Sequence, residues 1–195
     1  MKIAITGGIG SGKSYVCRML ERRDIRVYDC DTAAKRLMHT SPTLKRQLRQ
    51  LVGDSVYSAD GHLQKRVLAE FLLANEANKQ AVNDVVHPAV ADDFTASGME
   101  WLESAILFES GFYRRVKFDH TVCVTAPCDI RISRIVQRDG ITPERAAEWI
   151  DAQMPQEEAA ARCDFRITND DTGNLERQIE EMLQAFGITQ NKGSK

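Results

Sequence analysis

Eight residues near the N-terminus, Gly7 to Ser14, have the types and spacing of a phosphate-binding loop. They read G-G-I-G-S-G-K-S and fit the pattern G-x-x-x-x-G-K-[ST]. Glycines let backbone N–H groups converge on phosphate oxygens, and a following helix N-terminus adds partial positive charge. Lys13 can reach the β- and γ-phosphates, and the Ser14 hydroxyl can coordinate Mg²⁺. The alternative is a glycine-rich turn with a chance lysine, but a predicted strand before the loop and a predicted helix after it favour a nucleoside triphosphate site.

Two aspartates that follow the second predicted strand are candidates for acid–base chemistry. Asp29 and Asp31 point to the same side of an extended chain. One of them could orient an acceptor hydroxyl and take its proton. The other interpretation is structural, because Asp31 precedes a predicted helix, Thr32–Met38, and could cap it. We expect one aspartate to cap the helix and the other to act on the substrate.

Five short apolar segments, separated by helical ones, must position these residues. The expected strands are Lys2–Thr6, Arg26–Tyr28, Ser104–Phe108, His120–Val124 and Arg166–Thr168. The alternation predicts an α/β fold with three layers and a doubly wound, parallel, five-stranded sheet. Ligands bind at the carboxyl ends of strands in such sheets. The residues that follow the strands are therefore the candidates for the site: Gly7–Ser14, Asp29–Asp31, Glu109, Thr125 and Asn169.

Two helical stretches interrupt this alternation. The first predicts helices at Thr32–Met38, from Ser41-Pro42 to about Leu51, at Lys65–Leu73 and at Asn75–Thr95. We interpret it as a helical substrate-binding insertion. The second, Arg138 to Arg162, contains charged helices joined by a glycine and a proline, which predicts a mobile lid or else a helical hairpin that does not move.

The domain prediction follows from these stretches. We expect a single domain over 1–195, with a closing helix at Asn174–Phe186 and a frayed polar tail at 189–195. Its parts are a core of 1–31, 101–137 and 163–188, an insertion of about 32–100, and a lid of about 138–162.

Composition narrows the class of protein. The 195 residues are 43% hydrophobic and 28% charged, with a formal net charge of −2, which gives no general reason to expect nucleic-acid binding. The five cysteines are scattered and none forms a C-x-x-C pair, so zinc or a disulfide framework is not expected. No signal-peptide pattern and no membrane-spanning apolar run is present. These features predict a cytoplasmic protein without a membrane or nucleic-acid partner.

Within the proteins that carry such a loop, the missing motifs favour a small-molecule kinase. A GTPase would need N-K-x-D after a late strand, and the sequence has none. A motor-type ATPase usually carries an apolar run that ends in Asp-Glu, and Ser104 to Glu109 approaches it with a single carboxylate. A kinase for a small hydroxyl substrate needs a phosphate cradle, a metal, a carboxylate near the acceptor and basic lid residues.

Several motifs together make the resemblance specific. T-G-G-I-G-S-G-K-S is followed by Val27-Tyr28-Asp29-Cys30-Asp31, His87-Pro88, Ile106-Leu107-Phe108-Glu109, Gln137-Arg138-Asp139, Gln153, and Asp164 through Asn169. In order and spacing the chain resembles the dephospho-coenzyme A kinase family over nearly its whole length. The resemblance implies transfer of the γ-phosphoryl group of ATP, with Mg²⁺, to the ribose 3′-hydroxyl of dephospho-CoA. It also implies a nucleotide-binding core, a helical CoA-binding part and a lid.

The resemblance assigns roles to particular residues. Asp31 matches the catalytic aspartate on the acceptor side, Arg138 matches the lid-base arginine that faces the ATP phosphates, and His87 matches the substrate-side histidine. His87 could instead be a buried histidine satisfied by a carbonyl. Glu109 could hold a metal-bound water or cap the following turn. The expected ATP contacts are Gly8, Gly10, Ser11, Gly12, Lys13, Ser14, Tyr15 and Asn169, with Mg²⁺ on Ser14.

Three positions depart from the family pattern. Tyr15 stands where relatives usually have threonine, which removes a small hydroxyl near the α-phosphate. Ala105 replaces a usual proline, a local backbone change. Ala159 stands where relatives tend to carry a lysine or arginine. Because Arg162 lies three residues further along the same helical face, we predict that it supplies the missing cation, although it could equally be a solvated surface residue.

Two other functions are compatible with the loop. One is another small-molecule or nucleotide kinase on the same fold, although an adenylate-kinase-like enzyme would need more arginines for a second phosphate group. The other is a non-catalytic nucleotide-binding regulatory module, against which the intact Lys13, Ser14 and Asp31 argue. The expected assembly is a monomer or weak oligomer.

Overall fold

The chain divides into two compact units. The structure is a computed structural model that describes residues 1–188, so the predicted frayed tail lies outside the described residues. The first unit comprises Met1–Tyr28, Met99–Glu109 and the chain from Lys117 onwards. The second comprises Asp29–Gly98 and Ser110–Val116.

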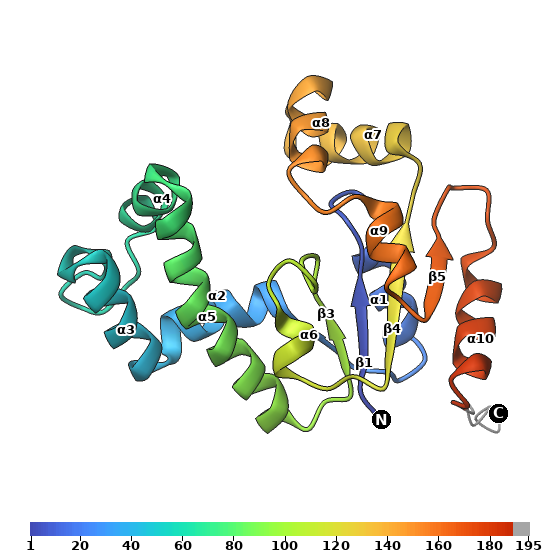
Figure 1. The fold of residues 1–195 in the computed structure, drawn as a ribbon, viewed down its shortest axis with the longest axis horizontal. Helices are drawn as coiled ribbons and strands as arrows, with labels where there is room; N and C mark the ends of the chain where they lie inside the picture. Colours follow the sequence, from blue (N-terminus) through green and yellow to red (C-terminus); the bar gives the residue numbers. More distant parts are fainter. Residues whose placement is uncertain (189–195) are drawn as a thin grey trace. The chain divides into compact units, whose positions relative to one another are not determined.

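A parallel β-sheet forms the centre of the first unit, as predicted. Its five strands lie in the order β2-β3-β1-β4-β5. The pairs β1–β3, β1–β4 and β4–β5 are parallel, and Ile5 lies opposite Glu103. Figure 1 shows β1 in the middle of the sheet. The strand bounds are β1 Ile3–Thr6, β2 Val27–Asp29, β3 Trp101–Glu103, β4 His120–Thr125 and β5 Phe165–Thr168.

The predicted position of the third strand is wrong. The strand is Trp101–Glu103, and the apolar run that was expected to form it lies in turns. The amide of Ser104 still donates to the carbonyl of Ile5 at 2.9 Å, after which the chain leaves the sheet. Leu107 and Phe108 are buried although they are not in a strand, because their side chains pack from the turns. The apolar residues of this run are therefore buried without belonging to the sheet. The carboxylate at the end of the third strand is that of Glu103.

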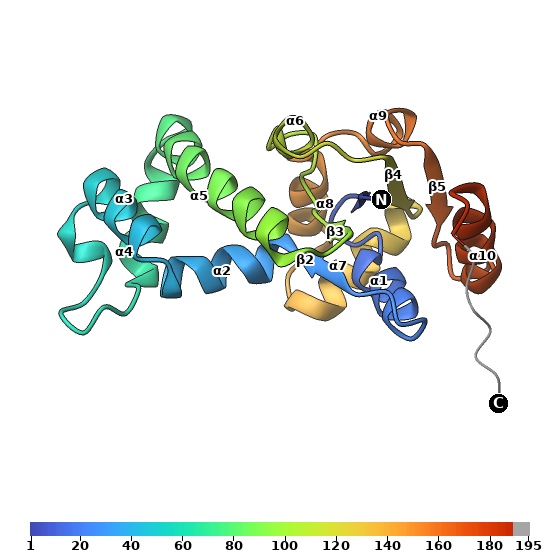
Figure 2. The ribbon, with the colours of Figure 1, turned by 90° about the horizontal axis from the view of Figure 1, so that it is seen from below.

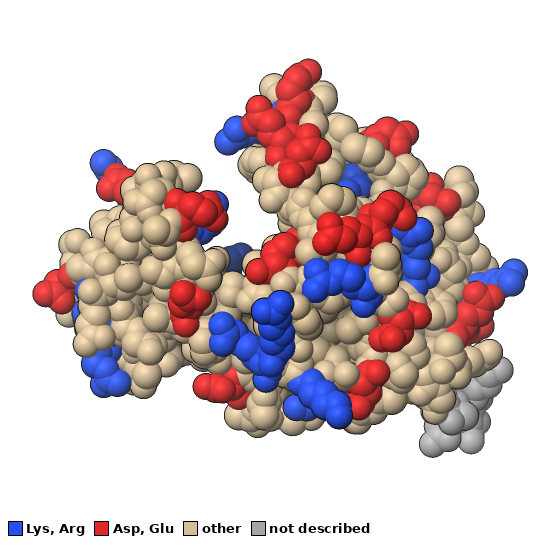
Figure 3. Space-filling view, in the orientation of Figure 1, with Lys and Arg blue, Asp and Glu red and all other residues tan. Residues whose placement is uncertain are grey.

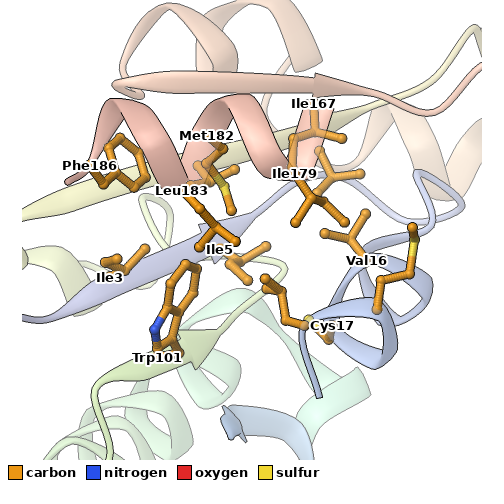
Figure 4. Packing of buried hydrophobic residues seen from close by; sticks show 14 residues of the cluster. Ile3, Ile5, Val16, Cys17, Trp101, Ile167, Ile179, Met182, Leu183 and Phe186 are labelled. Carbon is orange, nitrogen blue, oxygen red and sulfur yellow. The ribbon is translucent and has the colours of Figure 1, made fainter. Parts of the chain in front are cut away.

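Helices cover both faces of the sheet. On one face, α1 and α10 share a hydrophobic core with the strands, and Figure 4 shows Ile5, Val16, Ile167, Ile179 and Met182 converging there. On the other face α9 contacts β4, and Figure 2 shows it across the sheet from α1. The helices of this unit are α1 Lys13–Glu21, α7 Cys128–Asp139, α8 Pro143–Asp151, α9 Gln156–Ala161 and α10 Leu175–Ala185. Of these, α7 was not predicted.

The second unit is helical, as predicted for the insertion. Helices α2, α3 and α4 each contact the long helix α5, which has Pro88 in its interior. Ser41 caps α3 by accepting from the amide of Leu44 at 3.3 Å, which confirms the expected Ser-Pro start of that helix. The elements are α2 Cys30–Thr40, α3 Pro42–Val52, the 3₁₀ turn η1 Asp54–Val56, α4 Lys65–Ala74, α5 Glu76–Ser97 and α6 Phe112–Arg115.

The predicted lid stretch consists of α8 and α9 with their connections. Thr142 caps α8 by accepting from the amide of Arg145 at 3.3 Å, and Pro143 occupies the first turn. Figure 3 shows acidic side chains gathered over α8, which marks a solvated outer face. None of the helices between residues 1 and 188 is long and apolar enough to cross a membrane.

Candidate active site

The glycine loop between β1 and α1 has the backbone geometry of a phosphate cradle. Gly12 is the N-cap of α1 with φ +88°, a left-handed conformation that glycine adopts without steric cost. A Cβ atom at Gly12 would collide with the side-chain amide of Asn169, and one at Gly8 would collide with the guanidinium of Arg131. Gly12 is therefore required by its left-handed backbone and its close neighbour, whereas a side chain at Gly8 would make the Arg131 guanidinium shift.

Side chains from outside the loop bind its carbonyl oxygens. Arg131 Nε donates to the carbonyl of Ile9 at 2.9 Å. Arg134 donates to the carbonyls of Gly10 and Ser11 at 3.3 and 3.4 Å. The Asn169 amide also donates to Ser11, at 3.0 Å. Carbonyls held in this way leave loop amides as the groups available to an anion, apart from those of Ile9 and Ser11, which donate to Gln153 and Gly8.

Arg131 and Arg134 were not identified from the sequence. They lie three positions apart on α7, so they share one face of that helix. Arg138 follows four positions after Arg134, and this helical spacing of three arginines was the available signal. Arg131 is only 5% exposed, and burial lowers the pKa of its guanidinium. Arg134 also donates to Asp171 at 2.5 Å, which ties the loop to the chain after β5.

Lys13 is buried and faces a carboxylate that sequence reasoning missed. Its Nζ lies 3.7 Å from Oε1 of Glu103, and the two side chains are 9% and 13% exposed. Glu103 ends β3, the neighbour of β1, so the acid and the loop lysine come from adjacent strand ends. The missed signal was the short buried pair Trp101-Leu102 followed by an acid, which the longer apolar run downstream obscured.

The structure separates the two aspartates that the sequence left as alternatives. Asp29 is the N-cap of α2, and its carboxylate accepts from the amide and hydroxyl of Thr32 at 3.0 and 2.9 Å. Asp31 lies in the first turn of α2 and is exposed. None of the hydrogen bonds or ion pairs found among residues 1–188 engages its carboxylate. The capping role therefore belongs to Asp29, and Asp31 has no such structural task.

The lid stretch contacts the phosphate loop through a glutamine. Gln153 Oε1 accepts from the amide of Ile9 at 2.7 Å. The next residue, Met154, donates its amide to Oε1 of Glu109 at 3.2 Å. Glu109 thus binds the lid backbone in this structure, whereas a metal-bound water and a turn cap were the expected roles.

The two predicted lid cations have other partners in this structure. Arg138, at the end of α7, binds Asp139 with its guanidinium, and its side chain is 59% exposed. Arg162 lies over the ring of Phe108, with 4.1 Å between Cζ and the ring centroid. Ala159 is buried on α9, so its methyl group packs inward. The structure brings neither arginine's head group to the loop carbonyls, which Arg131 and Arg134 occupy.

His87 is half-buried on α5, next to Pro88. Burial and the nearby Arg115 lower the pKa of its imidazole, while Asp84 and a hydrogen bond to the backbone carbonyl of Ser110 oppose that shift. A lowered pKa leaves the ring neutral at pH 7. The role of His87 towards the substrate stays a prediction.

A pocket of about 550 Å³ opens beside the loop within the first unit. Its walls include Gly12, Tyr15, Arg134, Asn169 and Asp171. Asn169 therefore has two roles in the site, because its side-chain amide supports the loop and the residue also lines the pocket. The volume is in the range of small-ligand sites.

The oxygen donors near the loop fit Mg²⁺. The Ser14 hydroxyl is exposed at the first turn of α1, and Glu103 supplies a carboxylate at the neighbouring strand end. Residues 1–188 contain no cluster of three or more His, Cys, Asp or Glu that could hold a metal by themselves. Mg²⁺ is commonly held by one or two protein oxygens together with substrate phosphates and water, which suits such a sparse donor set.

The strand order, the loop after the central strand and the covering helices define a P-loop kinase fold. A shikimate kinase of known structure from Bacteroides thetaiotaomicron shares this fold, with a TM-score of 0.58 at 12% identity, covering 96% of this chain and 98% of that one.

Closer similarities give the family. The sequence matches the dephospho-CoA kinase family over residues 1–175. A dephospho-CoA kinase from Bacteroides fragilis (strain YCH46) is 41% identical over 190 residues, which are 94% of this chain and 91% of the relative. A protein of known crystal structure from Thermus thermophilus is 32% identical with a TM-score of 0.74, covering 95% of both chains. The chain therefore belongs to the dephospho-CoA kinase family, and its sequence resemblance to that family is confirmed.

Proposed function

We propose that this protein transfers the γ-phosphoryl group of ATP to the ribose 3′-hydroxyl of dephospho-CoA, giving CoA and ADP, the last step of CoA biosynthesis. The observation that carries the proposal is the glycine loop with its buried Lys13, in a chain that matches the dephospho-CoA kinase family over residues 1–175. The loop binds the triphosphate through backbone amides, since its carbonyls are held by Arg131, Arg134 and Asn169.

The chain's own residues divide the reaction between them. The acceptor 3′-oxygen forms a bond to the γ-phosphorus while the bond from that phosphorus to the β–γ bridging oxygen breaks, and ADP leaves. Asp31 takes the proton of the 3′-hydroxyl. Lys13 neutralises charge on the transferring phosphoryl group. Ser14 would hold Mg²⁺, with the Glu103 carboxylate nearby to position it, and the ion would supply further neutralisation of phosphate charge.

The division of the chain into parts is proposed on the same basis. The nucleotide-binding core spans 1–31, 101–137 and 163–188, the helices of about 32–100 bind dephospho-CoA with the help of His87, and about 138–162 form the lid. In this scheme Gln153 connects the lid to the Ile9 amide of the loop, Glu109 holds the lid backbone at Met154, and Arg138 approaches the phosphates when ATP binds. We further place the protein in the cytoplasm, which its five free thiols support, and we propose a monomer or weak oligomer.

One assay tests the proposed function. ADP release is measured with purified protein, ATP and Mg²⁺ against a panel of acceptors that includes dephospho-CoA, shikimate and nucleoside monophosphates. Turnover that depends on dephospho-CoA is the expected result. Preferred turnover with another acceptor would establish a different small-molecule kinase, and ATP binding without turnover on any acceptor would establish a nucleotide-binding module.

Glu103→Gln is expected to weaken binding of the divalent cation and to lower kcat by roughly ten- to a hundred-fold, the usual effect of losing a residue that supports a metal site. The amide keeps the side chain's shape but removes its charge, so both the metal water shell and Lys13 lose an anionic partner. Electron paramagnetic resonance of Mn²⁺ in the presence of ADP measures the affinity without turnover. Unchanged Mn²⁺ affinity together with unchanged kcat would remove Glu103 from the site.

Arg162→Ala is expected to lower kcat by about ten-fold or more while it weakens ATP binding less, because a lid cation acts on charge that develops in the transition state. Arg162 must leave the Phe108 ring to do so. Steady-state kinetics and ATP binding measured separately give the two effects.

The matched control for Arg162 is Arg177→Ala. Arg177 is an exposed arginine of α10 paired with Glu181, and it has no part in the proposed site. Its removal should leave kcat and the KM for ATP unchanged. If Arg162→Ala also leaves both constants unchanged, Arg162 does not supply the cation that is missing at Ala159.

A further inference from the structure

Tyr15 presents a large ring to solvent at the start of α1, directly after the loop. The residue is 45% exposed, whereas Val16, Cys17, Met19 and Leu20 of the same helix are buried. Arg18 lies near the ring, with 5.7 Å between Cζ and the ring centroid. No hydrogen bond of the described residues involves the Tyr15 hydroxyl. An exposed aromatic ring contributes little to folding. Because this ring lies beside a ligand-binding loop, we consider a role in ligand binding.

The first unit fixes the direction in which a triphosphate must lie on the loop. Lys13 turns towards Glu103, on the β3 side of β1, and this marks the end of the loop where the γ-phosphate belongs. The pocket lies on the opposite side, because its walls include Asn169, which follows β5, and Leu175, which begins α10. A nucleotide whose γ-phosphate meets Lys13 therefore directs its nucleoside towards the pocket. Figure 1 shows β3 and β5 on opposite sides of β1.

Tyr15 is both a residue that follows the loop and a wall of that pocket. The other walls near it are mostly polar: Arg134, Asn169, Asp171 and Asn174. All four can supply hydrogen bonds or charge, but a purine also needs a flat apolar surface on which its ring can stack. Among the pocket walls, Tyr15 is the aromatic residue.

We propose that the Tyr15 ring stacks against the nucleoside of ATP and so determines a large part of the protein's affinity for the nucleotide. The inference rests on the proposed function, since it assumes that ATP is the phosphoryl donor. It gives the departure at position 15 a physical meaning: the chain exchanges a small hydroxyl at the α-phosphate for an aromatic surface at the base and ribose. Recognition then shifts from the phosphate chain towards the nucleoside.

The test compares two probes on two variants. Binding of ATP and of inorganic tripolyphosphate, which has no nucleoside, is measured by calorimetry on the wild type, Tyr15→Ala and Tyr15→Phe. Alanine is chosen over threonine because a threonine hydroxyl could form a new bond to the α-phosphate and hide the loss. Tyr15→Ala is expected to raise the Kd for ATP by roughly ten-fold, as for the loss of a base-stacking side chain, and to change the Kd for tripolyphosphate less than two-fold.

Tyr15→Phe keeps the ring and is expected to bind both probes within about two-fold of the wild type. Equal weakening of both probes in Tyr15→Ala would show that Tyr15 acts on the phosphate loop, and unchanged ATP binding would show that it does not contact the nucleoside. Either result overturns the inference while the proposed function stands. A wild-type protein that binds tripolyphosphate but not ATP would overturn both.

Discussion

Lys13→Ala is expected to abolish phosphoryl transfer, with kcat lowered roughly a thousand-fold or more. The Lys13 ammonium is the buried cation at the end of the loop where the γ-phosphate belongs, and charge spreads onto the phosphoryl oxygens in the transition state. Its burial beside Glu103 means that the charge acts where water screens it least. The measurement is coupled ADP release with dephospho-CoA, together with thermal denaturation of the same preparation.

The ion pair with Glu103 makes a second variant necessary. Removing Lys13 alone leaves the Glu103 carboxylate without this cation in a largely buried position, which lowers stability. The double variant Lys13→Ala/Glu103→Gln also removes the carboxylate charge that Lys13 faced, so its melting temperature should return towards that of the wild type while its activity stays lost. A folded Lys13→Ala protein with near-normal turnover would show that the loop does not bind the transferring phosphate as proposed.

Local patterns were sufficient to predict most of the fold. The loop, the strands β1, β2, β4 and β5, and the capped helix starts at Ser41 and Thr142 are each specified by residues a few positions apart. Such features depend on backbone conformation and on nearby hydrogen bonds, which a single sequence displays directly.

The parts that could not be predicted depend on contacts between distant segments. Arg131 meets the loop across 122 positions of sequence, and nothing around it indicates that partner. Glu103 was missed because a three-residue strand is too short for its pattern to compete with the buried turn residues that follow it. Arg131 and Glu103 were both missed, and both are residues that hold the loop or its lysine in place.

Asp31→Asn is expected to lower kcat by roughly two to four orders of magnitude, the range for loss of a positioned general base. Asparagine has nearly the same shape but cannot take the proton of the acceptor hydroxyl. ATP binding should change little, since Asp31 is assigned to the acceptor and not to the nucleotide. Because Asp31 makes no capping bond and is exposed, the free energy of unfolding should fall by only about 0.3 kcal/mol, the lower value for an exposed charge near a helix N-terminus.

Asp29, two positions earlier, is the matched control for this prediction. Asp29→Ala removes the carboxylate that accepts from the Thr32 amide, so it should cost about 1 kcal/mol of stability. It should leave kcat close to that of the wild type, because the capping bond engages no substrate. The two variants therefore exchange their effects: Asp31→Asn loses turnover and keeps its melting temperature, and Asp29→Ala does the reverse. If Asp31→Asn instead keeps kcat and loses thermal stability, Asp31 is a structural residue of α2 and the acceptor-side base must be another group.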